Sequence, residues 1–490
     1  MAKFNTARVR KHTPTKTNFA GGRAHAQSAK LELVSILLTA MLNGDRYYES
    51  NDDTIKRMIG LLDRVDPLFA AKAAVYARNE FGLRSISHIA AAEIAKRVKG
   101  ESWTKRFVNA VVRRPDDMTE IMAYHLATSG KPVPNSMKKG LATAFDKFDH
   151  YQLAKYRGEG KTVSLVDLVN MVHPVPTRKN AKALADLVAG TLKSTGTWEA
   201  KLTTVGQTST SDQDKAAKKA AAWTELVRER KIGYFALLRN LRNIVQTAPE
   251  LVDDVCALLT DESLIHKSLV LPFRFTTAYD VIDRRKIKLV RALNKALDIS
   301  CANVPDLPRS LVVCDFSGSM GGGIKSNRGI GTLLGAILAK RSEADFMIFG
   351  SYAAYVPFNP DDSVMTLFDS TVTLNSGWSG RRNSTNVGHG TNFEAIFETA
   401  DKAYDRIFVF SDMQGWMGRG APDRAVAAYK KRFNCDPYIY SMDLAGHGTM
   451  MFPEDKVACI PGFSDKIFGL IAQMETDKEA LIKKIDAIDF

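Results

Sequence analysis

Cysteine is scarce in this sequence and is not spaced for a disulfide framework or a zinc site. The five cysteines are an odd number and lie far apart along the chain: Cys256, Cys301, Cys314, Cys435 and Cys459. Zinc ligands and the disulfides of small secreted domains come instead at short, paired spacings. We therefore expect reduced thiols that are mostly buried.

Long hydrophobic runs are also missing. No uninterrupted apolar stretch approaches the length of a transmembrane helix, and the N-terminal residues lack the apolar segment and cleavage site of a secretory signal. We therefore expect a cytoplasmic protein that does not enter a membrane. The chain has 490 residues, of which 45% are hydrophobic and 25% charged, so it is long enough for two or three domains with ordinary cores.

Acidic residues are absent from residues 1–24, and an excess of positive charge extends over the first part of the chain. Residues 1–300 contain 49 Lys and Arg against 31 Asp and Glu, whereas residues 301–490 contain 19 against 23. A surplus of positive charge attracts polyanions such as nucleic acid. A basic domain that is merely well solvated fits the charge equally well. We expect residues 1–24 to be a basic arm that is disordered or lies against a partner.

Apolar residues recur at helical spacing through most of residues 27–297. The stretches 66–82, 87–98 and 284–297 each place apolar residues three and four positions apart, and short turn signals separate such stretches. Helices of a few turns joined by short loops are typical of α-solenoids, in which pairs of helices stack. The sequence therefore predicts an α-solenoid.

Residues 194–215 depart from this helical pattern. They are rich in Ser, Thr and Gly, and Trp198 is their one aromatic side chain and the large apolar anchor. Such a composition favours irregular structure on the surface. We expect a loop between helices, with Trp198 packed and the remainder exposed.

Beyond residues 301–309, which have the composition of a linker, short apolar strands alternate with helices. Strand-like runs lie at 311–315, 344–350, 406–412 and 436–444. They are apolar on both faces, which is typical of a parallel sheet covered by helices on both sides. The sequence therefore predicts an α/β doubly wound domain over residues 310–490, and ligands of such sheets bind at the carboxyl ends of the strands.

Oxygen-bearing side chains lie at these carboxyl ends. The stretch DFSGSMGGG supplies Asp315, Ser317 and Ser319, Thr391 lies at a predicted helix start, and Asp412 ends a strand. Two carboxylates and three hydroxyls suit Mg²⁺ or another divalent cation, with a coordination position left open for an oxygen of a partner. The alternative is that the hydroxyls cap helices and the first acid closes a turn. All five positions resemble the metal-ion-dependent adhesion site of von Willebrand factor A domains.

A hydrolytic role for this site would need more than the metal ligands. A catalytic metal requires a positioned base or a second ion to generate and use hydroxide. The loops that carry the motif contain two acids, and the nearby His389 flanks Thr391 in a glycine-rich turn. We interpret His389 as a turn residue, with an auxiliary polar contact as the alternative, and expect binding rather than hydrolysis.

Several longer stretches resemble the Ro ribonucleoprotein autoantigen family, whose members join a TROVE domain to a C-terminal von Willebrand factor A domain. The resemblance is carried by LVDLVNMVHPVPTRKNAKAL (165–184), TGTWEAKLT (195–203), WTELVRERKIGYFALLRNLRNI (223–244) and LPFRFTTAYDVI (271–282). With the A domain it covers nearly the whole chain. It implies HEAT-like helical repeats closed into a ring over residues 1–300, and an A domain over residues 310–490 that joins the two ends.

The same resemblance implies a role in RNA metabolism without catalysis. Members of the family bind small non-coding Y RNAs on a basic outer face and thread single-stranded 3′ ends of misfolded RNAs into the central hole. They are RNA quality-control scaffolds, and bacterial relatives assist exonucleolytic processing. We therefore expect a monomeric, non-enzymatic RNA-binding scaffold. An exoribonuclease or another protein would dock a carboxylate at the metal.

The candidate RNA-contacting residues are basic side chains in loops and on helix faces. Arg and Lys contact phosphates with little regard to sequence, and histidine rings stack on unpaired bases. In LLRNLRNI, two arginines and two asparagines occupy adjacent faces of one helix and contact either RNA or neighbouring helices. A histidine before a proline either contacts RNA or caps a turn. The full set is His173, Arg178, Lys179, Lys138, Lys139, Arg239, Arg242 and Arg84.

Two other functions remain open from the sequence. A metal-dependent protein–protein adaptor would bind an acidic protein with its helical array and would have no role with RNA. A metal-dependent phosphohydrolase would cleave RNA, and its activity would depend on Asp315.

Overall fold

The computed structural model describes residues 16–42, 47–193, 198–268, 270–302, 304–359, 361–372, 374, 386–418, 422–452, 456–462 and 465–490. Its elements gather into two compact units. The helical unit contains the described residues of 40–45, 49–303 and 481–490, and the sheet unit contains those of 1–39, 46–48 and 304–480. The helical unit holds most of the excess positive charge that the sequence shows.

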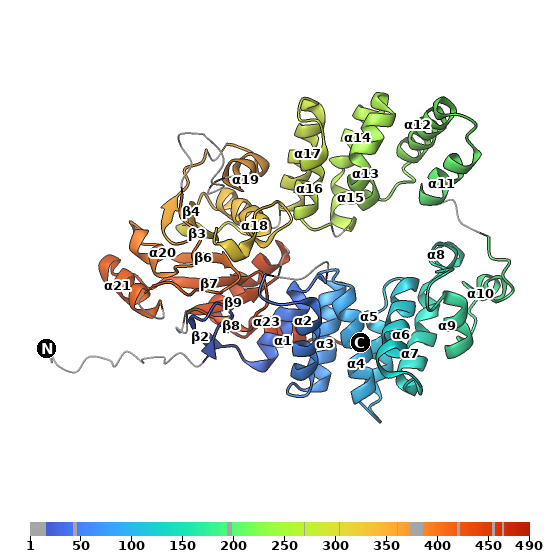
Figure 1. Ribbon diagram of the computed structural model, residues 1–490, viewed down its shortest axis with the longest axis horizontal. Helices are drawn as coiled ribbons and strands as arrows, with labels where there is room; N and C mark the ends of the chain where they lie inside the picture. Colours follow the sequence, from blue (N-terminus) through green and yellow to red (C-terminus); the bar gives the residue numbers. More distant parts are fainter. Residues whose placement is uncertain are drawn as a thin grey trace. The chain divides into compact units, whose positions relative to one another are not determined.

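Helices follow one another at short intervals through the helical unit (Figure 1). Several of them bury one stripe: α5 buries Thr104, Phe107, Val108 and Val111, a helical spacing. α4 packs on α6, and α5 packs on α7. The elements are α2 (Asn51–Leu62), α3 (Pro67–Asn79), α4 (Ser85–Arg97), α5 (Trp103–Val111), α6 (Pro115–Ser129), α7 (Asn135–Ala144), η1 (Phe145–Lys147), α8 (His150–Lys155), α9 (Leu165–Val172), α10 (Ala181–Val188), α13 (Tyr234–Thr247), η2 (Pro249–Leu251), α14 (Val252–Leu259), α15 (Glu262–Ser268), α16 (Phe273–Val281) and α17 (Ile287–Ser300).

The prediction of a loop over residues 194–215 is wrong for the residues of this range that the structure describes. Residues 194–197 lie outside the described residues, and the rest form α11 (Trp198–Thr208) and the start of α12 (Asp212–Arg228). Ser211 caps α12 through its side chain, and the rings of Trp198 and Trp223 stack with centroids 6.1 Å apart. The Ser and Thr residues therefore cap or face solvent in helices, which their composition alone does not reveal.

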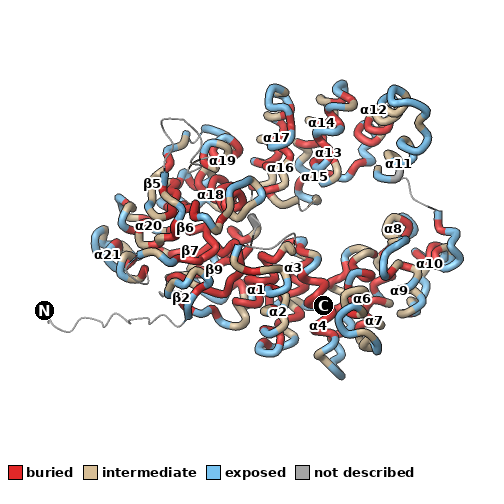
Figure 2. The backbone as a smooth tube through the Cα atoms, in the orientation of Figure 1, coloured by how far each residue is buried: buried red, intermediate tan, exposed pale blue. Residues whose placement is uncertain are grey.

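The sheet unit is built on six strands in the order β5-β4-β3-β6-β7-β9. Every neighbouring pair is parallel except β4 and β5, which confirms the predicted parallel sheet. β3, β6 and β7 are buried along nearly their whole length (Figure 2). The strands are β3 (Ser310–Asp315), β4 (Asp345–Phe349), β5 (Ala353–Tyr355), β6 (Arg406–Ser411), β7 (Tyr438–Asp443) and β9 (Val457–Pro461).

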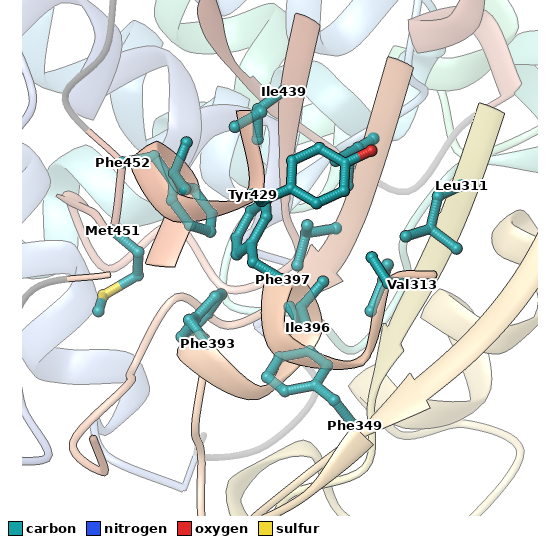
Figure 3. Packing of buried hydrophobic residues seen from close by; sticks show 14 of the residues in the cluster. Leu311, Val313, Phe349, Phe393, Ile396, Phe397, Tyr429, Ile439, Met451 and Phe452 are labelled. Carbon is teal, nitrogen blue, oxygen red and sulfur yellow. The ribbon is translucent and has the colours of Figure 1, made fainter. Parts of the chain in front are cut away.

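Helices cover both faces of this sheet. Leu311 and Val313 face the cluster in Figure 3, which includes residues of α20 (Glu394–Thr399) and α21 (Asp423–Phe433). The alternate residues of β3 face α18 (Asn327–Arg341), where a Cβ on Gly335 would lie 2.6 Å from the Cys314 sulfur. Glycine thus allows α18 to approach the sheet closely. The remaining elements of this unit after β3 are η3 (Gly318–Met320), α19 (Val364–Val372), η4 (Asp465–Leu470) and α22 (Ile471–Thr476).

The described residues before α2 pack in the sheet unit. β1 (Lys16–Thr17), β2 (Arg23–Ala26) and β8 (Thr449–Met450) form a small antiparallel sheet, and α1 (Ala29–Thr39) contacts β9. Asn18 Nδ2 donates to the carbonyl of Gly415 at 2.7 Å, and the Phe19 N–H donates to Gln414 Oε1 at 2.8 Å. A Cβ on Gly22 would lie 1.9 Å from the Gly415 carbonyl oxygen, so the close approach requires glycine.

The compact units therefore differ from the predicted ranges 1–300 and 310–490. Residues 16–39 pack with the sheet, and the end of the chain, which includes most of α23 (Ala480–Asp486), packs in the helical unit. Residues 16–24, predicted to be part of a disordered or partner-bound arm, instead form β1, the following turn and the start of β2, whereas residues 1–15 lie outside the described residues. Backbone pairing with β8 is a long-range contact that local composition does not encode.

Two findings concern the helices and the cysteines. None of the helices in the described part of the chain has both the length and the apolar character that crossing a membrane requires. No disulfide joins the five cysteines, all of which are described, and Cys301, Cys314 and Cys459 are buried.

Candidate functional site

The two predicted acidic ligands lie at the same edge of the sheet. Asp315 is the last residue of β3, and Asp412 directly follows β6, which pairs with β3 in parallel. The carboxyl ends of neighbouring parallel strands meet at one edge, so the topology brings together two acids that are distant in sequence. Both are buried, with 1% and 2% of their surface exposed.

Hydrogen bonds connect these acids to the two predicted serines. The Ser317 N–H donates to Asp315 Oδ1 at 2.8 Å, which closes the turn after β3. The hydroxyl oxygens of Ser317 and Ser319 lie 3.4 Å apart, and Ser319 also hydrogen-bonds Asp412. The turn that the alternative interpretation expected is therefore present, and it places two hydroxyls beside two carboxylates.

Backbone hydrogen bonds position the loop of Thr391 against the other two loops. The Gly318 N–H donates to the carbonyl of His389 at 2.9 Å, and the Trp416 N–H donates to the carbonyl of Thr391 at 3.2 Å. Gly318 belongs to the loop after β3 and Trp416 to the loop after Asp412. Three segments that are separate in sequence thus meet at one place. His389 is exposed in its turn.

The two acids share a site with too little positive charge to balance them. Burial, and after it the charge of Asp315, raise the pKa of Asp412 to about 7, although the hydrogen bond from Ser319 opposes both. Burial also raises the pKa of Asp315, although it accepts hydrogen bonds from Ser317 and Ser411. Two carboxylates forced together in a buried site disfavour each other's ionised form, and a bound cation would relieve this.

The basic side chain whose charge acts on Asp315, Arg328, forms no ion pair with either acid in the described part of the chain. Arg328 Nη2 donates to the backbone carbonyls of Phe316 at 3.0 Å and Ser317 at 3.2 Å. Its guanidinium also lies over the Phe316 ring at 5.1 Å. Arg328 therefore stabilises the backbone of the loop, and its charge acts on Asp315 only from a distance.

The donor set fits a hard divalent cation. Buried carboxylates and hydroxyls are the ligands that Mg²⁺ prefers, and it rarely requires an all-protein cage. Among the described residues no three His, Cys, Asp or Glu side chains are grouped to hold a metal. A cation at this place would therefore depend on Ser317, Ser319 and Thr391 in addition to the two acids.

Sequence reasoning missed two polar residues at this edge of the sheet. The hydroxyl of Ser411 donates to Asp315 Oδ2 at 2.6 Å. Asp443 ends β7 beside the end of β6, and its Oδ1 accepts from the N–H groups of Ala445 and Gly446. Its buried Oδ2 has no hydrogen-bond partner among the described residues, and its charge raises the pKa of Asp412 further. Its place at a strand end is the signal that could have identified it.

Three aromatic side chains lie near the same site and carry no sequence signal. The hydroxyls of Tyr48 and Ser319 are hydrogen-bonded, and burial raises the pKa of Tyr48. The Tyr48 ring lies 6.0 Å from that of His447 and 6.4 Å from that of Phe19. These residues come from three distant segments of the sheet unit, so only the folded chain reveals the group.

Arg84, one of the predicted RNA-contacting residues, forms ion pairs with two aspartates of the helical unit. Its Nη2 lies 2.8 Å from Asp116 Oδ2 and 2.9 Å from Asp117 Oδ1. Asp117 also accepts from Arg78 at 2.7 Å and from His88 at 3.0 Å. Arg84 therefore takes part in a structural network, with 34% of its side chain still exposed.

Five further candidates lie on or beside α7 and α9, which pack together. His173 is exposed and ends α9 in a left-handed conformation (φ 49°), so it does cap the helix. Arg178 is exposed, and Lys179 Nζ donates to the carbonyl of Lys147 at 2.6 Å. Lys138 is half-buried and Lys139 exposed. None of these five pairs with a carboxylate among the described residues.

The last two candidates lie on one face of α13. Arg239 and Arg242 are exposed, and neither pairs with a carboxylate of the described chain. Asn240 is buried and its Nδ2 donates to the carbonyl of Ala236 at 2.9 Å, whereas Asn243 is exposed. Neighbouring helices therefore offer no hydrogen-bond or ion-pair partner to Arg239 or Arg242 in the described chain. The interpretation that the two arginines and two asparagines of this helix all bond within the unit does not hold for the two arginines.

Together these features define a class of protein: an array of helices with exposed, unpaired basic side chains, joined in one chain to an α/β unit whose strand ends carry a carboxylate and hydroxyl site. The TROVE domain family matches residues 22–214 and 189–313. These matches cover more than half of the chain, which therefore belongs to the TROVE domain family. The matched region includes β2 and α1, so the family's sequence unit extends into the compact sheet unit.

Similarity to individual proteins is lower. The chain is 24% identical over 346 residues to telomerase protein component 1 of Rattus norvegicus and to that of Mus musculus. Each alignment covers 54% of this chain and 13% of the relative, so the chain spans only a small part of these proteins. The fold is similar to the crystal structure of the Ro (RSR) protein of Deinococcus radiodurans. The TM-score is 0.58 and the identity 19%, over 91% of this chain and 100% of that chain.

Proposed function

We propose that this chain is a non-enzymatic RNA-binding scaffold of a ribonucleoprotein. The observation that carries the proposal is the set of exposed basic side chains on the helical unit that have no carboxylate partner in the described chain, notably Arg178, Lys139, Arg239 and Arg242. Cations that are not neutralised within the protein are free to contact phosphates, and they release counterions when they do. Membership of the TROVE family supports the same conclusion.

The finer parts of the proposal rest on resemblance to the Ro family. The helical unit would close into a ring, bind small non-coding Y-type RNA on its outer face, and hold single-stranded ends of misfolded RNA in a central cavity. His173 and the basic residues of α7 and α9 would contact the structured RNA. The scaffold would act in RNA quality control or processing and would present RNA to an exoribonuclease.

The sheet unit would be a von Willebrand factor A domain with a metal-dependent docking role. Asp315, Ser317, Ser319, Thr391 and Asp412 would hold Mg²⁺ or another divalent cation. The bound ion would supply a positive charge to which a carboxylate of a partner protein can bind. In the absence of a partner, Ser411 and the turn after β3 keep Asp315 oriented toward the site.

A salt titration of RNA binding tests the main function. With a small structured RNA, we expect the affinity of the full chain to fall by about 100-fold between about 50 and 200 mM salt, because several phosphate contacts each release counterions. Fluorescence anisotropy measures this slope. The double variant Lys139→Ala/Arg178→Ala should bind RNA more weakly, and its affinity should depend less steeply on salt. The control is Arg285→Ala, which removes a 92% exposed cation that is paired with Asp283.

Two outcomes would reject this function. If the chain binds no RNA at about 50 mM salt but retains a partner protein, it is a protein–protein adaptor instead. If it binds RNA and cleaves it, and Asp315→Ala abolishes the cleavage, it is a metal-dependent phosphohydrolase.

A further inference from the structure

Two short pieces from the start of the chain lie against loops that carry predicted metal ligands. They are residues 16–26, which form β1, β2 and the turn between them, and residues 47–48, and both belong to the sheet unit. Below we name the two pieces together the N-terminal segment. Neither piece contains a metal ligand predicted from the sequence. Each piece contacts a loop that does, so the N-terminal segment lies beside the proposed cation site.

The Tyr48 hydroxyl contacts one of the predicted ligands directly. It is hydrogen-bonded to the Ser319 hydroxyl, which is hydrogen-bonded in turn to Asp412. A hydroxyl has one proton to donate, and an ionised carboxylate can only accept. Ser319 therefore donates to Asp412 and accepts from Tyr48 when Asp412 is ionised, as a metal ligand must be. Tyr48 thus fixes the direction of the Ser319 hydroxyl and leaves a second lone pair for a cation.

A second contact joins the N-terminal segment to the loop of Asp412. The side chain of Gln414, two residues further on, is fully buried, and its Oε1 accepts from the Phe19 N–H at 2.8 Å. The Gln414 N–H donates to Asp412 Oδ1 at 3.1 Å, and its Nε2 donates to the Asp412 carbonyl at 3.2 Å. One glutamine therefore holds both the carboxylate of a predicted ligand and the turn between β1 and β2.

Aromatic rings connect the two pieces of the N-terminal segment to each other. The Phe19 ring lies 6.4 Å from the Tyr48 ring, with an angle of 20° between their planes, and 5.1 Å from the His447 ring. The Tyr48 and His447 rings are 6.0 Å apart. Rings at such distances attract each other. Movement of the turn that carries Phe19 would therefore also disturb Tyr48 and its hydrogen bond to Ser319.

Packing alone does not explain where these contacts fall. Phe19 is 48% exposed, so the rings do not form a deep core. The polar contacts end instead on Ser319 and, through Gln414, on Asp412. Groups that hydrogen-bond metal ligands orient them, and their loss typically lowers metal affinity by about 10- to 100-fold. Because coupling between binding events is reciprocal, a segment that orients the ligands is itself stabilised when the cation binds.

We propose that the N-terminal segment completes the cation site, with Tyr48 as a positioning residue for Ser319, so that cation binding and the packing of residues 16–26 strengthen each other. This inference rests on the proposed cation-binding role of the sheet unit and adds how that role is regulated. A chain whose N-terminal segment is displaced would bind the cation weakly. Docking of a partner's carboxylate at the cation would weaken with it.

The test compares two neighbouring tyrosines in the full chain. Tyr48→Phe keeps the ring and removes the hydroxyl that holds Ser319, and we expect about a 10-fold loss of Mg²⁺ affinity by isothermal titration calorimetry. Tyr47→Phe removes a hydroxyl from a side chain that is 72% exposed and should leave the affinity unchanged. Without metal, the melting curves of both variants should nearly coincide with that of the unchanged chain, because both keep their ring contacts.

Two readouts report the coupling and would not respond to a purely structural role. Fluorotyrosine at position 48 should show a fluorine NMR shift on addition of Mg²⁺ that is much larger than the shift at position 47. Mg²⁺ should also slow the amide hydrogen exchange of residues 16–26 by at least about 5-fold, the lower end of the usual coupling between sites. This protection should be smaller in Tyr48→Phe at Mg²⁺ concentrations that saturate both proteins.

Three results would overturn the inference, and they differ in what they leave standing. If the unchanged chain binds Mg²⁺ and Tyr48→Phe binds it as Tyr47→Phe does, Tyr48 is not part of the site, although the cation site stands. If Tyr48→Phe melts earlier without metal and Mg²⁺ leaves the exchange of residues 16–26 unchanged, Tyr48 has only a structural role. If the unchanged chain binds no Mg²⁺, the proposed cation site fails and the inference fails with it.

Discussion

Replacing Asp117 with asparagine is expected to lower the free energy of unfolding of the helical unit by about 3–5 kcal/mol. The Asp117 side chain is fully buried and accepts hydrogen bonds from Arg78 at 2.7 Å and from the N–H groups of Arg113 and Arg114 at 2.9 and 3.0 Å. His88 lies 3.0 Å away. The substitution leaves the buried Arg78 without its counterion, which costs far more than the loss of an exposed pair. Urea denaturation followed by circular dichroism measures the change.

The effect of pH on this variant has a definite sign. Burial alone would raise the pKa of Asp117, but the hydrogen bond from His88 and the charge of Arg78 outweigh it and hold the pKa well below its usual range. A carboxyl with a lowered pKa in the folded state contributes stability above its unfolded pKa of about 4, and this stability is lost as the pH falls below that value. The difference between Asp117→Asn and the unchanged chain should therefore be full at neutral pH and shrink below about pH 4.

A matched control lies on the same helix. Glu120 is 49% exposed and pairs with Lys161 at 3.1 Å, so Glu120→Gln makes the same charge change at the surface. We expect it to cost less than about 1 kcal/mol. Equal losses of stability in the two variants would show that the buried network around Asp117 has no special role.

Replacing Asp315 with alanine is expected to weaken Mg²⁺ binding by at least about 100-fold, because even residues that only orient a ligand contribute about 10- to 100-fold. Asp315 is one of two buried carboxylates at the site. In the metal-free protein the buried carboxylates of Asp315 and Asp412 repel each other. The substitution removes this repulsion, so the variant should remain folded. Isothermal titration calorimetry with Mg²⁺ and Mn²⁺ measures the loss.

RNA affinity should change by less than about 2-fold in the Asp315→Ala variant, because the metal site and the basic side chains belong to different compact units and share no partner. Asp405→Ala is the matched control, since Asp405 is exposed, precedes β6 at the opposite edge of the sheet and pairs with Arg309 at 3.3 Å. Metal binding unchanged in Asp315→Ala would reject the proposed ligand set. Loss of RNA affinity in the folded variant would reject the separation of the two roles.

The elements of regular structure could be predicted where the local pattern is strong. β3, β6 and β7 are continuous apolar runs, and α5 has a clear apolar stripe, so period and composition alone identify them. The meeting of Asp315 and Asp412 also followed from sequence, because parallel neighbours place their carboxyl ends at one edge.

The failures share a physical cause, which is dependence on distant contacts. α11 has a Ser- and Thr-rich sequence, and its Trp198 stacks on Trp223 of another helix. β1 and β2 are short and polar, and β2 pairs with β8 from the far end of the chain. Neither stretch has a local pattern strong enough to overcome its composition.

The candidate sites show the same division. The arginines at positions 239 and 242 could be selected from their spacing on one helix, but Arg274 joins them only through the packing of α16 on α13. Likewise, the hydrogen bond between Tyr48 and Ser319 depends on segments that are distant in sequence. Arg84 was a reasonable candidate as a basic loop residue, and only the structure places it against Asp116 and Asp117.

The central claim is that RNA is held by the helical unit, and ultraviolet crosslinking of RNA to the full chain followed by mass spectrometry tests it most directly. The account predicts crosslinked peptides that contain α7, the loop after α9, α13 and α16. Crosslinks confined to residues 310–480 of the sheet unit would contradict it, as would a chain that recovers no crosslinked RNA.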